Sequence, residues 1–140
     1  MIPTIKVGGP GEGKTKWLMQ KLFFNAQVGK RVYLLMNDSE QFSRFMNKYR
    51  TRYNSICPVE RATKETVFKS TDVLLIDDLM KEMHSTCKTI LLNAFNSEAK
   101  IYITINGVAE NEDIPDTEIP EHIGEQLHIN IEDLMLEARS

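Results

Sequence analysis

A glycine-rich segment near the N-terminus carries the clearest chemical signal in the sequence. Residues 8–15 read Gly-Gly-Pro-Gly-Glu-Gly-Lys-Thr and match the pattern G-x-x-x-x-G-K-[ST] in full. Glycines let successive backbone N–H groups turn toward phosphate oxygens, and a following helix points the positive end of its dipole at the same anion. Lys14 would reach the β- and γ-phosphates, and the Thr15 hydroxyl would become a Mg²⁺ ligand. The predicted phosphate-binding residues are Gly8, Gly9, Pro10, Gly11, Glu12, Gly13, Lys14, Thr15 and Lys16.

Two carboxylates follow an apolar run in the middle of the chain. The run Val73-Leu74-Leu75-Ile76 predicts a buried strand, and Asp77 and Asp78 come directly after it. Ligands of open parallel sheets bind beyond the C-terminal ends of the strands. Asp77 would hold Mg²⁺, directly or through water, and Asp78 would orient or activate an attacking water. The alternative is that the two acids cap the helix that follows them.

A third polar side chain follows the next predicted strand. Residues 100–105 form an apolar, β-branched run that is followed by Asn106. The Asn106 amide could orient the attacking water or sense the γ-phosphate. Because Asn106-Gly107 is also a common turn dipeptide, both interpretations stay open.

Strand and helix patterns alternate along the chain and predict the elements that would position these residues. The predicted strands are residues 4–7, 32–36, 72–77, 100–105 and 126–131. The predicted helices run from Lys14 to a stop at Gly29, from a cap at Asp38 through the apolar row Phe42, Phe45, Met46 and Tyr49, and over residues 64–69 and 81–96. This alternation predicts an α/β fold in which helices cover both faces of a mostly parallel sheet.

The length and composition are those of one ordinary globular domain. The chain has 140 residues, of which 41% are hydrophobic and 26% charged, so we expect a single domain over residues 1–140. No apolar run approaches the roughly 20 residues of a membrane span, and no secretory signal is visible. The two cysteines have no metal-site spacing and suggest a reduced, cytoplasmic setting. So small a chain would suit a phage, which would place it in the host cytoplasm.

The net charge of −3 conceals an asymmetry between a basic body and an acidic tail. Residues 1–105 hold 16 Lys and Arg against 10 Asp and Glu, whereas residues 106–140 hold one against 10. We expect residues 108–125 to form an acidic loop, which is either solvated or docked on a basic partner.

A basic stripe falls on the second predicted helix. Arg44, Lys48 and Arg52 recur every four residues, and Arg50 lies nearby. With Tyr49 and Tyr53 interleaved, the stripe would suit nucleic-acid phosphates and bases. The alternative is an ordinary solvated helix face whose tyrosines turn into the core.

Taken together, these motifs resemble the P-loop NTPases, with residues 8–15 similar to a Walker A motif and residues 73–78 to a Walker B motif. The doubled carboxylate and the later strand ending Thr104-Ile105-Asn106 are similar to the additional-strand (ASCE) branch and, within it, to the AAA+ core of helicase loaders and replication initiators. The resemblance covers residues 2–106. It implies a P-loop NTPase sheet with the Walker A strand beside the strand that ends at Asn106, ATP and Mg²⁺ as cofactors, and work on nucleic acid or protein in an oligomer.

The sequence also departs from that branch. Asp78 stands where Glu is more usual, and no Lys or Arg lies between Lys100 and Arg139, where AAA+ proteins keep a lid and an arginine finger. We therefore expect a minimal core without a helical lid. The missing cation would come from a protein partner, from a second copy, or from Arg44, Arg50, Arg52, Arg61 or Arg139.

These features lead us to expect a Mg·ATP-binding ATPase, associated with nucleic acid, that turns over slowly or when a partner stimulates it. It would be a minimal motor or loader in DNA replication or packaging, with no membrane partner. One alternative is an ATP-dependent switch or scaffold with little turnover. A second is a small kinase, although the acidic residues 108–125 stand where kinases close an arginine-rich lid.

Overall fold

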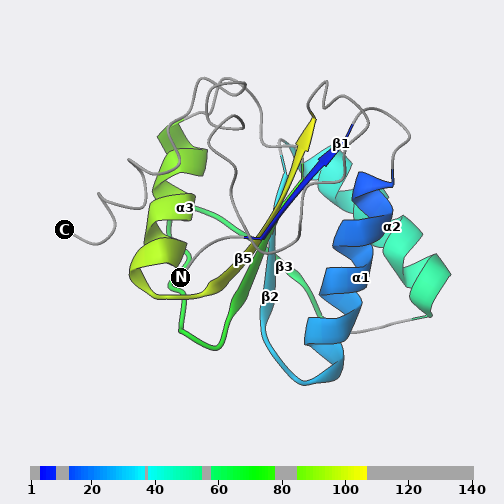
Figure 1. Cartoon of the computed structure of the whole chain (residues 1–140), viewed down its shortest axis with the longest axis horizontal. Coiled ribbons are helices and arrows are strands. Elements are labelled where there is room, and N and C mark those ends of the chain that lie inside the picture. The colour runs from blue at the N-terminus through cyan, green and yellow to red at the C-terminus, as the bar shows by residue number, and fades with distance from the viewer. Residues whose placement is uncertain (1–3, 9–12, 37, 55–57, 78–84, 107–140) are drawn as a thin grey trace.

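The computed structural model describes residues 4–8, 13–36, 38–54, 58–77 and 85–106 (Figure 1). The strands are β1 (Thr4–Gly8), β2 (Val32–Leu35), β3 (Glu60–Arg61), β4 (Val73–Ile76) and β5 (Lys100–Asn106). The helices are α1 (Lys14–Gln27), α2 (Ser39–Tyr53) and α3 (Ser85–Asn96). The acidic loop expected at 108–125, the strand expected at 126–131 and the expected first turn of the helix at 81–84 lie outside the described residues.

The described strands form one parallel sheet in the order β1-β5-β4-β2-β3. Four strands have four to seven residues, and the two-residue β3 lies at one edge. β1 pairs with β5, with Gly8 opposite Asn106, and β5 in turn pairs with β4. This confirms an α/β fold with a parallel sheet, and it confirms that the strand leading into the glycine-rich segment lies beside the strand ending at Asn106.

Helices flank the sheet on both faces, with α1 and α2 on one side and α3 on the other (Figure 1). Successive side chains of a strand point to opposite faces, so each apolar strand supplies both cores. Leu34 and Leu75 pack in the core beneath α1 and α2, whereas Leu35 and Leu74 pack in the core beneath α3. The uninterrupted apolar runs of β2 and β4 thus follow from burial on both sides.

Helix α1 ends at the glycine that the sequence predicts as its stop. Gly29 has a φ of 81°, a left-handed conformation that glycine adopts without strain. The Gly29 amide donates to Ala26 O at 3.0 Å and the Lys30 amide to Asn25 O at 3.1 Å, which is the hydrogen-bond pair of a Schellman motif. This motif turns the chain from α1 toward β2.

Helix α2 begins at the predicted cap. The Asp38 carboxylate accepts a hydrogen bond from the Gln41 amide at 2.8 Å. The helix turns its predicted apolar row inward, with Phe45, Met46 and Tyr49 buried. The start and the buried face of this helix are both as predicted.

The helix predicted over residues 64–69 is absent, and that prediction was wrong. The Thr66 hydroxyl accepts from the Thr63 amide at 2.9 Å, and the Thr63 hydroxyl accepts from the Glu65 amide at 3.3 Å. Threonine hydroxyls that bond nearby backbone groups offer the chain an alternative to a helix. The segment therefore forms a turn in front of β4.

An ion pair between the buried carboxylate of Asp72 and the half-exposed guanidinium of Arg31 joins the N-terminal ends of β4 and β2. Asp72 is 2% exposed and accepts from Arg31 Nε at 3.0 Å, from Arg31 Nη2 at 2.6 Å and from the Lys69 amide at 2.8 Å. Burial acts to raise the pKa of Asp72, but the hydrogen bonds and the charge of Arg31 outweigh it, so the pKa lies below its usual value. The pair lies just before β2 and β4, at the N-terminal ends of the parallel strands. Gly8 and Asn106 lie at the opposite, C-terminal ends.

Among the described residues, no helix is long and apolar enough to cross a membrane.

Candidate functional site

Most of the predicted site residues that the structure describes lie at the C-terminal ends of the parallel strands. β1 ends at Gly8 and β5 at Asn106, and the two residues pair in register. Ile76 pairs with Ile103, so Asp77 lies next to Thr104 just beyond the end of β4. Helix α1 begins after β1 and contacts β5 and β4 as well as β1. Strand order therefore brings the beginning of α1 and the ends of β1, β4 and β5 to one edge.

The N-terminus of α1 has the features of an anion site. Its cap is Gly13, which has a left-handed φ of 77° and no side chain to bond the first amides. The first turn holds no acidic residue, in contrast to α2, where Asp38 caps the helix and Glu40 lies in the first turn. The first amides of a helix have no partner within it, and they favour an anion together with the dipole.

Lys14 and Thr15 open this helix in different environments. Lys14 is 8% exposed, although lysine is among the residue types that are least often buried. Thr15 is exposed at the first turn. The fold thus holds the lysine within the protein at the edge of the sheet and leaves the threonine hydroxyl accessible.

Thr104 holds the Asp77 carboxylate in place. Its hydroxyl donates to Asp77 Oδ1 at 2.9 Å and lies 3.4 Å from Ile76 O, and the Thr104 side chain is fully buried. The Asp77 amide donates to Leu35 O at 3.1 Å, which fixes the backbone beside β2. Backbone and carboxylate are therefore both oriented, as is usual for a metal ligand with a supporting hydrogen bond.

Thr104 was not among the predicted site residues. Thr104 is a single hydroxyl in the apolar run of β5, between Ile103 and Ile105. A polar residue at a fully buried strand position needs a hydrogen-bond partner. That signal was present in the sequence, but the partner depends on the pairing of β5 with β4.

Several predicted site residues lie outside what the structure describes. Residues 9–12 of the glycine-rich segment and Asp78 are among them, and their roles stay predictions. Asn106 is placed as the last residue of β5, and its predicted contact with a γ-phosphate also stays a prediction.

The two predicted metal ligands, Thr15 and Asp77, suit a magnesium ion bound together with a nucleotide. Among the described residues, no three His, Cys, Asp or Glu side chains gather in a cluster that could hold a metal. Mg²⁺ keeps several waters and commonly takes one or two protein ligands together with substrate phosphates. The oriented carboxylate of Asp77 and the exposed hydroxyl of Thr15 fit this requirement.

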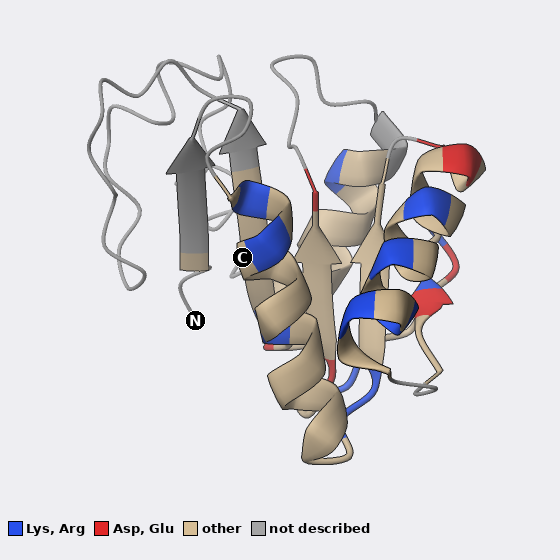
Figure 2. Cartoon of the chain, turned by 90° about the vertical axis from the view of Figure 1, so that its right-hand side faces the viewer, with Lys and Arg blue, Asp and Glu red and all other residues tan. Residues whose placement is uncertain are grey.

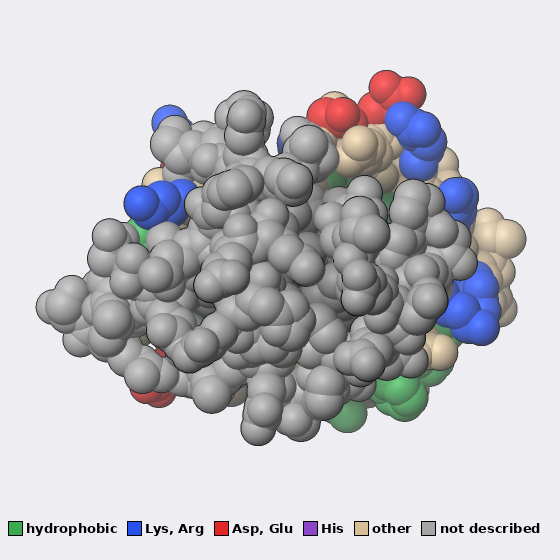
Figure 3. All heavy atoms as spheres, turned by 45° about the horizontal axis from the view of Figure 1, so that its top comes forward, with side chains coloured by type: hydrophobic (Ala, Val, Ile, Leu, Met, Phe, Trp, Pro, Cys, Tyr) green, Lys and Arg blue, Asp and Glu red, His purple; other side chains and the backbone are tan. Residues whose placement is uncertain are grey.

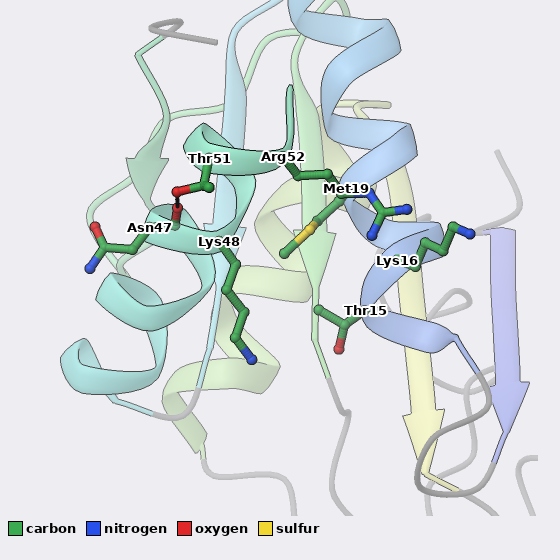
Figure 4. A pocket seen from close by; sticks show the side chains of 7 residues that line it. All are labelled: Thr15, Lys16, Met19, Asn47, Lys48, Thr51 and Arg52. Atoms are coloured by element: carbon green, nitrogen blue, oxygen red, sulfur yellow. Dashed lines mark hydrogen bonds between the residues drawn. The ribbon is translucent and has the colours of Figure 1, made fainter. Parts of the chain in front are cut away.

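An open pocket lies between α1 and α2 and contains part of the basic stripe (Figure 4). Its volume is about 540 Å³. We call it the α1/α2 pocket, and its lining residues are Thr15, Lys16, Met19, Asn47, Lys48, Thr51 and Arg52. In Figure 4, Arg52 extends from α2 toward α1, and Lys48 and Thr15 lie on facing sides of the space between the helices.

The structure divides the predicted basic stripe. Lys48 and Arg52 line the α1/α2 pocket, whereas Arg44 pairs with Glu40 at 3.3 Å on the exposed helix surface and Arg50 does not line the pocket. Basic residues follow α2 along the ribbon of Figure 2, and Lys and Arg side chains lie on the right-hand side of the molecule in Figure 3.

The interleaved tyrosines do not offer stacking surfaces. Tyr49 is fully buried, and Tyr53 stacks on Phe23 of α1 with ring centroids 4.8 Å apart. Of the two alternatives that the sequence left open, these contacts favour the one in which the tyrosines turn into the core, because the packing of α2 on α1 already uses both rings.

Comparison of the chain with protein-family models, with curated proteins and with solved structures gave no match.

Proposed function

We propose that the chain is a Mg·ATP-binding P-loop ATPase of the additional-strand branch. The strand order is the observation that carries this proposal. β5 lies between β1 and β4, so one strand separates the strand that enters the glycine-rich segment from the strand that ends at Asp77. The G-x-x-x-x-G-K-T pattern alone does not require this order, and the additional-strand resemblance does. Sequence motif and topology therefore support the same proposal independently.

The residues at the C-terminal ends of the strands and at the beginning of α1 take different roles in the proposed site. Lys14 and the first amides of α1 bind the nucleotide phosphates, and Thr15 and Asp77 hold the metal ion. Bound Mg²⁺ neutralises charge on the β- and γ-phosphates. Thr104 acts through Asp77 as a positioning residue, because its hydroxyl fixes one carboxylate oxygen at 2.9 Å.

Asp78 and Asn106 complete the proposed site. Asp78 accepts a proton from the attacking water, and the Asn106 amide orients that water or contacts the γ-phosphate. Turnover by the isolated chain is slow on this proposal, since an arginine from a partner or a second copy normally stabilises the transition state.

Phosphate release tests the proposal. We expect wild type to release phosphate from ATP in the presence of Mg²⁺, and Asp78→Asn to bind ATP normally but to hydrolyse it about 10²- to 10⁴-fold more slowly. The matched control is Glu65→Gln, which removes an exposed carboxylate in the turn before β4 and leaves turnover unchanged.

Two results would contradict hydrolysis as the function. Tight Mg·ATP binding without turnover, with or without DNA, would identify a switch or scaffold instead. Phosphate transferred to an added acceptor would identify a kinase.

A further inference from the structure

We propose that the α1/α2 pocket binds the phosphate backbone of a single-stranded nucleic acid. Three of its lining residues are basic, namely Lys16 on α1 and Lys48 and Arg52 on α2. In Figure 4, Arg52 reaches toward α1, whereas the exposed side chain of Lys16 extends away from α2. None of its seven lining residues is acidic, and none of these three cations forms an ion pair with another described residue. A ligand that carries several negative charges in a row can pair with more than one of these cations, as a chain of phosphates does.

The other two residues of the basic stripe do not line the pocket. Arg44 already has Glu40 as its partner at 3.3 Å, and Arg50 lies off the pocket. The structure therefore assigns phosphate contacts to two of the four stripe residues and adds Lys16, which comes from another helix. Arg52 brings a planar guanidinium that suits phosphate oxygens.

The packing of α1 and α2 favours a single strand over a duplex. Packed helices lie about 8–10 Å apart from axis to axis. A flexible single strand can bend to follow so narrow a space, whereas a duplex is stiff over about 150 base pairs and meets a surface only with a ridge of its backbone.

The pocket has no aromatic ring in its lining on which a base could stack. Neither tyrosine of α2 lines the pocket, since Tyr49 is buried and Tyr53 stacks on Phe23. Contacts made through phosphates alone carry no sequence information. We therefore expect binding that is independent of base sequence.

The pocket adjoins the proposed nucleotide site. Thr15 and Lys16 line the pocket and directly follow Lys14 in the first turn of α1. A strand bound here contacts the same helical turn as the ATP phosphates, so we expect it to change ATP turnover. This coupling rests on the proposed function, whereas binding of the strand does not.

The test measures binding of a fluorescent, mixed-sequence DNA oligonucleotide by anisotropy, without nucleotide, between 50 and 200 mM salt. Three phosphate contacts to a single strand predict a log–log salt slope of about −2.1 and hence a roughly 18-fold loss of affinity over this range. In Lys48→Gln/Arg52→Gln the slope should fall to about −0.7, with a loss of roughly 2.6-fold. The matched control, Arg44→Gln/Arg50→Gln, changes the net charge equally and should keep the wild-type slope.

Four outcomes would overturn the proposal. These are equal losses in the two double variants, affinity that does not change with salt, equal or tighter binding of a duplex, and equal binding of poly-glutamate. Wild-type thermal unfolding in both double variants, whose substituted residues are all exposed, excludes misfolding as a cause.

Lys14→Ala separates this proposal from the preceding one. Loss of ATP binding with retained DNA binding supports two adjacent sites. If wild type binds no ATP but binds the oligonucleotide with the predicted slopes, the proposed function fails and the pocket assignment stands. If wild type binds ATP but not the oligonucleotide at 50 mM salt, the pocket assignment fails alone.

Discussion

Replacing Thr104 by valine tests the link between the fold and the proposed metal site. Thr104 is fully buried in β5, and its hydroxyl donates to Asp77 Oδ1 at 2.9 Å. Valine keeps the branched shape and nearly the same volume, so the substitution removes the hydroxyl, with its hydrogen bond to Asp77 and its 3.4 Å contact with Ile76 O, and largely keeps the packing. Asp77 would then keep its backbone bond to Leu35 but lose the 2.9 Å hydrogen bond from Thr104 to its carboxylate.

The expected loss of Mg²⁺ affinity follows from the hydrogen bond between Thr104 and Asp77. A hydrogen bond to a charged group contributes about 1.5–3 kcal/mol. Asp77 is half-buried, so water can replace part of the lost contact, and we take the lower end, about 1.5 kcal/mol. This corresponds to roughly a tenfold loss of Mg²⁺ affinity, at the lower end of the roughly 10- to 100-fold range for losing the partner of a metal ligand.

The assay is ATP binding as a function of Mg²⁺ concentration. In Thr104→Val, the Mg²⁺ concentration needed for half of the metal-dependent gain in ATP affinity should rise about tenfold, while ATP binding in excess EDTA stays unchanged. Thr104→Ser keeps the hydroxyl and should restore the wild-type requirement. A folded Thr104→Val protein with the wild-type Mg²⁺ requirement, or a serine variant as impaired as the valine one, would refute the reasoning.

Two further predictions concern the scaffold of the site. Asp72→Asn should lower the free energy of unfolding by about 1.5 kcal/mol at pH 7, the lower end for a hydrogen bond to a charged group, because Asp72 loses its negative charge and water reaches the half-exposed Arg31. The folded-state pKa of Asp72 is depressed, so its contribution is present above the unfolded-state pKa of about 3.9 and is lost as pH falls further. Urea unfolding should show the difference from wild type shrinking below about pH 4, and a constant difference would contradict the assignment. Asp38→Ala should cost about 1 kcal/mol through loss of the α2 cap, measured by urea unfolding against Ser39→Ala, and equal stability of the two variants would argue against the cap.

The elements with strong local signals were predictable from the sequence. The apolar runs of β2 and β4, the cap at Asp38 and the stop at Gly29 follow from patterning and backbone preference. The helix expected over 64–69 failed because two threonine hydroxyls bond the backbone there, a competition that apolar periodicity does not register.

The order of the strands could not be predicted from local patterns. Nothing in the residues of β1 states that it pairs with β5, which lies far along the chain. That expectation came from the family resemblance, and the register of Gly8 with Asn106 confirms it. The contact between Thr104 and Asp77 was out of reach for the same reason, since it depends on which strand lies beside β4.

Which residues of the basic stripe line the α1/α2 pocket could not be predicted from local patterns either. Four-residue spacing correctly placed Arg44, Lys48 and Arg52 on one helix, but it could not tell which of them meet α1. Packing of α2 on α1 brings Lys48 and Arg52 to a pocket with Lys16 and leaves Arg44 with Glu40. The same packing buries Tyr49, so the tyrosines support the helix pair rather than a ligand.

The affinity of ATP for Lys14→Ala tests the central claim most directly. Isothermal titration in the presence of Mg²⁺ should show ATP binding to wild type and a loss of about 3 kcal/mol, roughly 100-fold or more, in the variant. Lys88→Ala, which removes an exposed lysine of α3, should bind ATP as wild type does. Wild-type affinity in Lys14→Ala, or no binding of ATP to the wild-type chain, would contradict a nucleotide site at the beginning of α1.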